Sequence, residues 1–502
     1  MKQIFFAITI LATLGACSDM LEEKPKSLAV ENFYQTKDEL VAAVNAIYVP
    51  IRTDGGFGIN YPAQLEGMAD YGYSRGSQTD VSGYKGLLPQ NVSRVQSVWE
   101  NIYQSIRNAN LVIANIPNAR QVSEADATAL MAEAKYLRAL LYFALVRNWK
   151  GVPLRTEANM EELALPRASI EDVYNLILAD ALVAEAGLPE ETPFDEKPTA
   201  AGRPNKWAAK TLLAEVYMTR ASTPDDFESK IAVKAEWTLA RDKAQEVMSS
   251  GEFALVEVRT SEDFQKIFGP EVVSTREEIF YLKYSRQQGF GLVSYAHRTK
   301  QYYGPGGVYA QYTDTVNNPI IKNWDPADLR REHMLYPDVF DKGPTTVLYR
   351  KYRDPLAVAV TAGVGGAGND YPWYRYADLL LFHAEAAARA AEAPTPEAME
   401  SLNQVHRRAY GYPSNTPSPV DFDIADYTLQ EFIDQVVEER GFETMYEGKR
   451  WLDLKRLGIA VQRIKEVKNI DVVEKHLFWP IPDSEMLYNE ALDPLTDQNP
   501  GY

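Results

Sequence analysis

Hydrophobic residues recur at helical spacing over most of the first half of the chain and again in its last quarter. Within residues 37–48, the apolar positions Leu40, Val44 and Ile47 are three or four residues apart, as on one face of an amphipathic helix. Ser169 precedes another such segment as a suitable N-cap, and Pro396 suits a first helical position. The same spacing predicts helices over residues 98–116, 132–149, 169–186, 205–218, 237–248, 374–386, 396–409 and 428–440.

These helices follow one another closely and carry small residues on their faces, such as Ala134, Ala139, Ala208 and Ala214. Small residues allow close packing, and helices in succession favour antiparallel pairs side by side, similar to tetratricopeptide repeats. No strict 34-residue consensus can be read. The pattern therefore predicts a mainly α fold built from helix pairs.

Two segments, about 54–91 and 251–370, lack helical periodicity and are rich in Gly, Pro, Asn and Tyr. Short strands are predicted within the second segment, for example over residues 278–283 and 346–351. Long irregular segments in compact domains are usually functional or disordered, and the aromatic content argues against disorder. We therefore expect a loop-rich part with a few short strands beside the helix pairs.

Residues 438–456 combine acids and bases with large apolar side chains such as Phe442, Tyr446 and Trp451. A solvated helix face does not need so many apolar groups. Because an unpaired buried ion is costly, we interpret the charges as mutual partners in a structural ion network rather than as a catalytic site. Its predicted members are Glu439, Arg440, Glu443, Glu447, Arg450, Asp453 and Arg456.

Composition and charge narrow the possible partners. The 502 residues are 45% hydrophobic and 24% charged, as in ordinary soluble proteins. A net charge of −18 argues against nucleic acid and anionic membrane surfaces as main partners, because both require basic patches.

Motifs for metal, cofactor or catalytic sites are weak. The five histidines are scattered and one cysteine is present, so no metal-ligand spacing can be read. The glycines of residues 363–368 fit a dinucleotide motif, but Pro372 interrupts the chain before a helix could begin. We predict no metal, no cofactor and no catalytic residue, although the 70 acidic residues leave a carboxylate-pair glycosidase open.

The N-terminus has the form of a lipoprotein export signal. Lys2 precedes a short apolar run over residues 4–14, and Leu14-Gly15-Ala16-Cys17 resembles a bacterial lipobox. The run is too short to span a bilayer. We expect a signal peptide at 1–16, a lipidated Cys17 with a tether over 17–30, and one domain over 31–502. A lipid on Cys17 would anchor the protein without spanning the membrane.

The irregular segments supply candidate ligand contacts. Flat aromatic rings flanked by Asp, Asn and Arg suit a sugar chain, because the rings bury its apolar faces while polar groups bind its hydroxyls. The alternative is that these tyrosines pack the loops onto the scaffold. The candidates are Asp70, Tyr71, Tyr73, Arg75 and Tyr84 in the first segment, and Tyr302, Tyr303, Tyr309, Tyr312 and Trp324 in the second.

Several motifs, in the right order, together resemble the SusD/RagB family of outer-membrane lipoproteins. One position departs from the family pattern, Thr444, where an apolar residue is usual. The matching segments are residues 99–103 (WENIY), 132–139 (AEAKYLRA), 151–154 (GVPL), 375–378 (RYAD), 384–386 (AEA), 439–456, 480–482 (PIP) and 498–502 (QNPGY).

The resemblance implies four helix pairs similar to tetratricopeptide repeats, supporting an irregular ligand-binding half. It also implies a non-enzymatic role at the cell exterior, as a lipid-anchored lid on a SusC-like TonB-dependent outer-membrane transporter that captures oligosaccharides for import. Two alternatives stay open: capture of peptides by the same import system, and a secreted carboxylate-dependent glycoside hydrolase.

Overall fold

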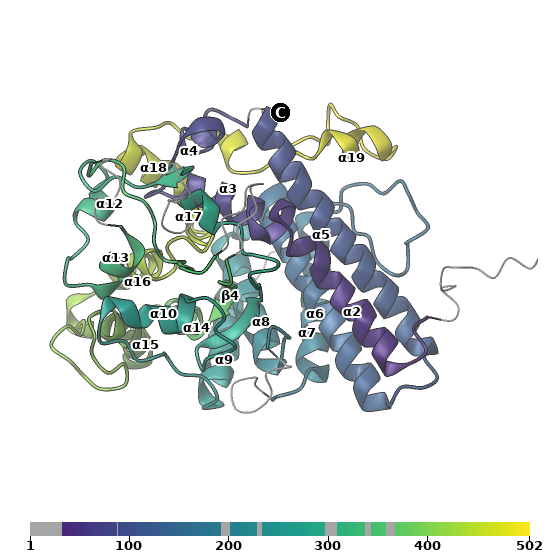
Figure 1. Cartoon of the computed structure of the whole chain (residues 1–502), viewed down its shortest axis with the longest axis horizontal. Coiled ribbons are helices and arrows are strands. Elements are labelled where there is room, and N and C mark those ends of the chain that lie inside the picture. The colour runs from purple at the N-terminus through teal and green to yellow at the C-terminus, as the bar shows by residue number, and fades with distance from the viewer. Residues whose placement is uncertain are drawn as a thin grey trace, which may run out of the picture.

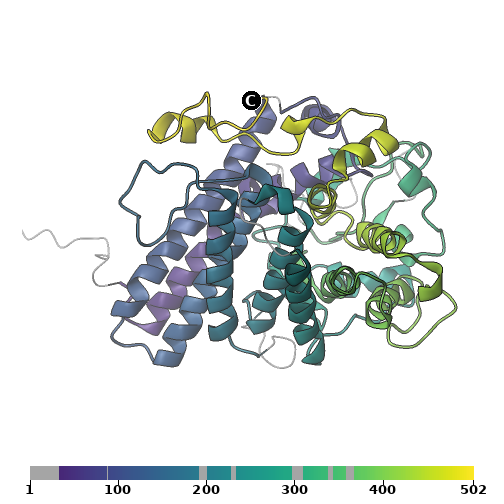
Figure 2. The same ribbon diagram turned by 180° about the vertical axis from the view of Figure 1, so that it is seen from behind.

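The computed structural model describes residues 33–87, 89–191, 201–227, 233–296, 309–336, 343–357 and 367–502. Cys17 and the predicted signal and tether therefore lie outside the described residues. Long helices stand side by side in one half of the molecule, and shorter helices and loops fill the other (Figure 1). The view from behind shows the same division (Figure 2). This arrangement confirms the predicted mainly α fold with an irregular half.

The long helices pack as pairs. Helix α2 packs on α5, α6 on α7, α8 on α9, and α14 on both α9 and α15. Neighbouring pairs also touch, through α5 with α6 and α7 with α8, so the pairs form a continuous layer. Their bounds are α2 (Lys37–Ile51), α5 (Pro89–Asn115), α6 (Glu124–Trp149), α7 (Ile170–Gly187), α8 (Lys206–Ser222), α9 (Val233–Ser249), α14 (Tyr376–Ala391) and α15 (Pro396–Ala409).

Local sequence fixes where these helices begin. Thr36 forms a capping box with Glu39 at the start of α2, and the Ser169 side chain accepts a hydrogen bond from the Asp172 backbone N–H at the start of α7. Pro396 is the first residue of α15. Such caps satisfy backbone N–H groups that the helix itself leaves without partners.

Apart from α16, which has 15 residues, the remaining helices are shorter. They include the π-helix η2 (Asp54–Gly58) and 3-10 helices such as η6 (Pro224–Asp226) and η7 (Ser261–Phe264). The α-helices of this group are α3 (Asn60–Met68), α4 (Thr79–Ser82), α10 (Gln265–Phe268), α11 (Val293–Ala296), α12 (Pro319–Lys322), α13 (Leu329–Met334), α16 (Leu429–Glu443), α17 (Arg450–Arg456), α18 (Ala460–Lys468) and α19 (Asp483–Tyr488).

The first irregular segment is more helical than its sequence indicates. Helix α3 occupies its middle, with every side chain from Tyr61 to Met68 buried. Pro62 near the helix start and Gly67 near its end hide this helix from a periodicity reading. Burial on all sides also removes the amphipathic pattern that would reveal it.

Two small antiparallel sheets complete the described fold. Strand β1 (Tyr73–Ser74) pairs with β3 (Gln311–Tyr312), placing Tyr73 opposite Tyr312. Strand β2 (Glu278–Leu282) pairs with β4 (Tyr371–Arg375) and confirms the strand predicted at 278–283. The other predicted strand, 346–351, is reduced to isolated bridges at Val347 and Tyr349.

The C-terminal segment, residues 478–502, packs across the end of α6 in the helical layer. The Trp149 indole N–H at the end of α6 donates to the Pro480 carbonyl at 2.8 Å. The Trp479 backbone N–H donates to the Asn148 carbonyl at 2.7 Å. The same segment also forms the short helix α19. No helix among the described residues is long and apolar enough to cross a bilayer.

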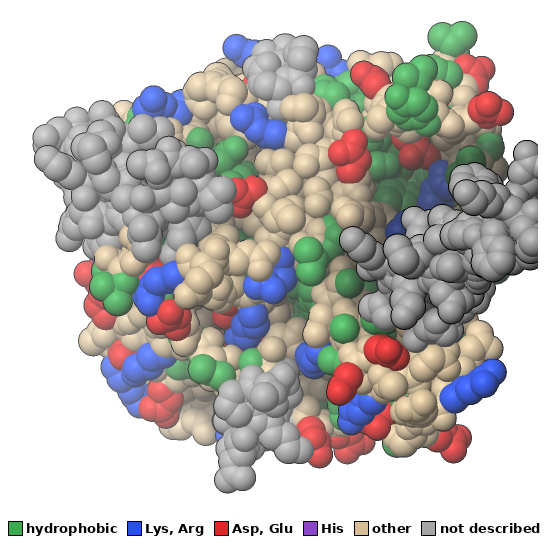
Figure 3. All heavy atoms as spheres, turned by 45° about the vertical axis from the view of Figure 1, so that its right-hand side comes forward, with side chains coloured by type: hydrophobic (Ala, Val, Ile, Leu, Met, Phe, Trp, Pro, Cys, Tyr) green, Lys and Arg blue, Asp and Glu red, His purple; other side chains and the backbone are tan. Residues whose placement is uncertain are grey.

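The surface does not concentrate one kind of charge on the face shown in Figure 3. Over the part of this face that the structure describes, acidic and basic side chains are interspersed, and hydrophobic side chains form small groups.

Candidate ligand-binding surface

A buried ion network joins the irregular half to the helices. Glu443 accepts hydrogen bonds from Arg375 at 2.8 Å and from Arg408 at 2.6 Å. Glu447 binds Arg375 at 2.7 Å and also pairs with Lys351. All five side chains are at least 99% buried. Their charged groups therefore pair with other protein groups rather than with water.

The network extends along α16 and α17 to α14. Arg440 pairs with Asp453 at 2.7 Å and with Asp378 at 2.9 Å. Asp453 pairs with Arg456 at 3.0 Å, which binds Glu385 on α14 at 2.6 Å. Glu439 pairs with Arg330 and Arg450 with Asp70, so all seven predicted network members are buried ion-pair partners.

Partner charges hold the acids of this network ionised. Burial alone would raise the pKa of Asp70, but the Arg450 and Arg463 guanidinium groups lower it to about 2. Burial likewise opposes ionisation of Glu447, and Arg375, Lys351 and Lys449 hold its pKa well below the usual range. Such permanently paired carboxylates are poor proton donors or acceptors near neutral pH, as expected of structural groups.

Four predicted ligand contacts are buried, which corrects their assignment. Asp70 is 0% exposed and pairs with Arg450; Tyr71 is 1% exposed and its hydroxyl donates to Glu66 at 2.8 Å. Tyr84 is 5% exposed and donates to the Met68 carbonyl. Trp324 is 3% exposed and stacks on Phe442. These groups stabilise the scaffold, as the packing alternative expected, and they are not accessible to a ligand. Tyr302 and Tyr303 lie outside the described residues.

The other four candidates come together on one surface, which we call the tyrosine platform: Tyr73, Arg75, Tyr309 and Tyr312. Tyr73 and Tyr312 face each other across the β1–β3 pair and stack with ring centroids 5.7 Å apart. Tyr309 meets Tyr312 edge to face at 6.0 Å, and the Arg75 guanidinium lies 4.4 Å from the Tyr309 ring centre. All three rings are partly exposed and Arg75 is exposed. Both irregular segments thus contribute to one surface.

One buried and one half-buried polar group, Asn318 and Lys468, hold the platform in place. The Asn318 amide donates to the Asp70 carbonyl at 2.9 Å and to the Tyr73 hydroxyl at 3.3 Å. Lys468 on α18 donates to the Ala69 carbonyl at 2.7 Å, and its ammonium lies 5.0 Å from the Tyr73 ring centre. Burial lowers the pKa of Lys468 to about 7. Sequence reasoning missed Lys468, because it lies almost 400 residues from the turn it supports.

The described residues contain no group of three or more His, Cys, Asp or Glu side chains arranged to hold a metal ion. The platform can instead offer flat apolar rings, hydroxyl groups and one cationic donor. This combination suits binding of a polyhydroxylated ligand without a catalysed reaction.

Comparison with known proteins identifies the family. A model described as starch-binding associating with outer membrane matches residues 19–218, and a SusD family model matches residues 297–502. The chain belongs to the SusD/RagB family. SusD-like proteins are a glycan-binding family, and they are non-catalytic. Family membership therefore removes the hydrolase alternative.

Individual relatives are similar to this protein over nearly the whole length of the chain. SusD-like protein P2 of Formosa agariphila is 28% identical, over 99% of this chain and 98% of the relative. A SusD homolog from Bacteroides thetaiotaomicron shares the fold with a TM-score of 0.78 at 22% identity, covering 94% of this chain and 98% of that chain. A laminarin binding SusD-like protein has a TM-score of 0.71 at 21% identity, covering 93% and 100%.

Proposed function

We propose that this SusD-family protein is a lipid-anchored, cell-surface protein that captures oligosaccharides on the tyrosine platform and delivers them to a TonB-dependent outer-membrane transporter. The observation that carries the proposal is the stacked pair of Tyr73 and Tyr312, with Tyr309 and Arg75 beside it. A sugar ring buries its C–H face on such rings, and the neighbouring hydroxyl and guanidinium groups bind its hydroxyls.

The anchor and the partner rest on the sequence and the family. Leu14-Gly15-Ala16-Cys17 resembles a lipobox, and the family model of the N-terminal half is described as associating with the outer membrane. A lipid anchor at Cys17 holds the binding domain at the membrane surface, where a transporter can receive the ligand. The laminarin binding relative makes β-glucan oligosaccharides the first ligands to test.

The experiment is titration calorimetry of the mature domain with laminari-oligosaccharides, malto-oligosaccharides and unrelated hexapeptides. Binding of at least one glycan series is expected, and Tyr312→Ala should weaken it by about ten-fold or more, as for a central aromatic contact. Tyr488→Ala is the matched control, because Tyr488 is 79% exposed on α19 and is not part of the platform. An equal loss of glycan affinity in both variants would reject the platform as the glycan-binding site.

The peptide alternative has a distinct outcome in the same titrations. Saturable binding of a hexapeptide with no heat from any glycan would replace glycan capture by peptide capture. Release of reducing sugar from a bound glycan would contradict binding without turnover.

A further inference from the structure

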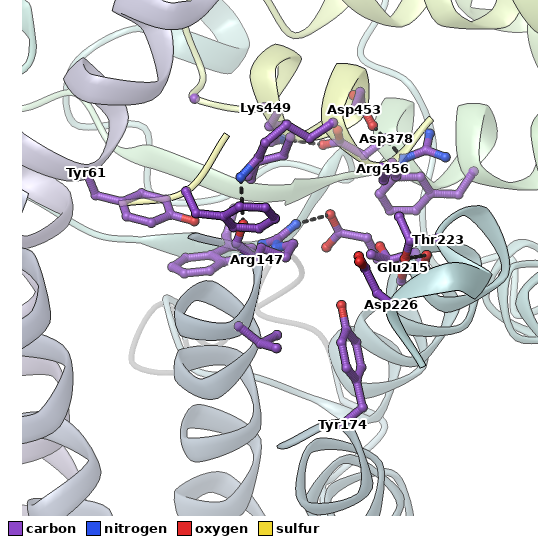
Figure 4. A pocket seen from close by; sticks show the side chains of 18 of the residues that line it. Tyr61, Arg147, Tyr174, Glu215, Thr223, Asp226, Asp378, Lys449, Asp453 and Arg456 are labelled. Carbon is purple, nitrogen blue, oxygen red and sulfur yellow. Dashed lines mark hydrogen bonds and ion pairs between the residues drawn. The ribbon is translucent and has the colours of Figure 1, made fainter. Parts of the chain in front are cut away.

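A cavity of about 90 Å³ lies where the end of α6 meets α7, α8, β4 and α17 (Figure 4). None of the tyrosine platform residues lines it. Its walls come from segments far apart in the chain, which the C-terminal segment closes through Phe478. The cavity is therefore a feature of the completed fold and separate from the platform.

Aromatic rings form much of the cavity wall. Tyr61 on α3 and Trp373 and Tyr374 on β4 line it. Tyr174 and Phe227 also line it, with their ring centroids 5.2 Å apart. Flat apolar walls with a few polar groups are typical of sites for small ring-shaped ligands.

Most charges around the cavity already have partners. Arg147 pairs with Glu215 at 2.7 Å, and Lys449 pairs with Asp378 at 2.7 Å. Figure 4 shows the Arg147–Glu215 pair crossing the middle of the cavity. Arg147 and Glu215 form a neutral pair, whereas Lys449 and Asp378 belong to the buried ion network. Neither leaves an unpaired charge that would select the charge of a ligand.

Two lysines differ. The ammonium groups of Lys150 and Lys455 lie 4.5 and 5.0 Å from the centre of the Phe478 ring. Lys455 donates to the carbonyls of Arg147 at 2.6 Å and Leu477 at 3.0 Å, and no carboxylate of the described residues forms a salt bridge with it. Burial lowers the pKa of Lys455 to about 7. Its charged form has three donors, so the ammonium has one more to offer a bound anion.

Asp226 is a carboxylate of the cavity wall on which both lysines act. Its side chain lies at the cavity wall, and the Tyr174 hydroxyl points toward it (Figure 4). Burial raises the pKa of Asp226, while the Lys150 and Lys455 ammonium groups act in the opposite direction. Both lysines therefore attract a carboxylate at this position, although burial outweighs their effect on Asp226.

We propose that this cavity binds a small organic carboxylate carried on a ring, with the carboxylate held by Lys150 and Lys455 and the ring placed between the aromatic walls. Asp226 then competes with the ligand for the same two cations. The site is independent of glycan capture on the platform, so either can fail alone.

The test uses calorimetry with D-glucuronate and benzoate as probes, each against its neutral counterpart, D-glucose and benzyl alcohol. At least one anion should bind, and at least about ten-fold more tightly than its neutral counterpart. Lys150→Met should weaken that binding by about five-fold, whereas Asp226→Asn should strengthen it by a similar factor. Both residues are near the surface, so the variants should fold, which circular dichroism would verify.

Lys210→Met provides the matched control. Lys210 on α8 pairs with Glu185 at 3.1 Å and is not part of the cavity wall, so its loss should leave probe affinity unchanged. Absence of binding by both anions, equal binding of anion and neutral probe, or an unchanged affinity in Asp226→Asn would each overturn the proposal.

Discussion

Arg450 on α17 donates two hydrogen bonds to Asp70, at 2.7 and 3.0 Å, although the two residues are 380 positions apart in the chain. Both side chains are at least 98% buried. Asp70 also begins the short turn that leads to Tyr73 on the platform. The structural ion network and the candidate ligand surface are therefore joined at this pair.

Arg450→Met should strongly destabilise the fold. It leaves the Asp70 carboxylate buried without its main partner, which typically costs about 3–5 kcal/mol. Urea unfolding would measure the loss. Arg241→Met is the control, because Arg241 forms an exposed pair with Asp242 and should change stability by less than about 0.5 kcal/mol. An Arg450→Met protein with wild-type stability that had lost only glycan binding would move the network into the ligand site.

Glu66→Gln should remove a pH dependence of stability. Burial raises the pKa of Glu66 to about 7, although the Gly448 N–H and the Tyr71 hydroxyl bind the carboxyl. The unfolded chain releases this proton near pH 4.5, whereas the folded chain keeps it until about pH 7. Ionisation between these values therefore favours the unfolded state, and wild-type stability falls as pH rises through this window.

The measurement compares unfolding free energies of the wild type and Glu66→Gln from pH 4.5 to 7.5. The stability of the variant relative to the wild type should increase by up to about 3 kcal/mol across the window and stay constant above it. Parallel pH profiles for the two proteins would show that Glu66 ionises normally in the folded state.

Gly448→Ala and Gly458→Ala form a matched pair. Both glycines have positive φ, 73° and 72°. Backbone strain should therefore lower the free energy of unfolding of each alanine variant by about 1–2 kcal/mol. At Gly448 the new Cβ would also lie 3.2 Å from the Pro62 Cα, whereas nothing lies within 4 Å at Gly458. Chemical denaturation should show a larger loss for Gly448→Ala, by about 1 kcal/mol or more. Equal losses would mean that α3 moves aside freely.

Cys17→Ala should release the protein from the membrane fraction of cells expressing the full chain. The thiol of Cys17 is the atom that lipidation requires, so without it no acyl chain can hold the protein. Immunoblotting of membrane and soluble fractions would check this, with Ser18→Ala as the control. An unchanged membrane fraction would contradict the proposed anchor.

The sequence correctly predicted the features that depend on residues close together in the chain. Helix α15 begins and ends where its pattern indicated, and Ser169 caps α7 as expected. It could not separate buried from exposed tyrosines. Tyr71 and Tyr73 are two residues apart, yet Tyr71 is enclosed by Tyr446 and Tyr349 while Tyr73 lines the surface. That difference is decided by segments about 240 to 380 residues away, which no local pattern encodes.

The packing of the C-terminal segment across the end of α6 has a consequence for synthesis. The partner of Asp70 is translated 380 residues later, and that of Trp149 is translated 331 residues later. At roughly 5–20 residues per second, this is a delay of about 20 s to more than a minute. Until then the Asp70 carboxylate and the Trp149 indole of the nascent chain have no hydrogen-bond partner with which to become buried. Chains that stop before residue 438 should therefore be cleared by proteases rather than persist as smaller binding modules.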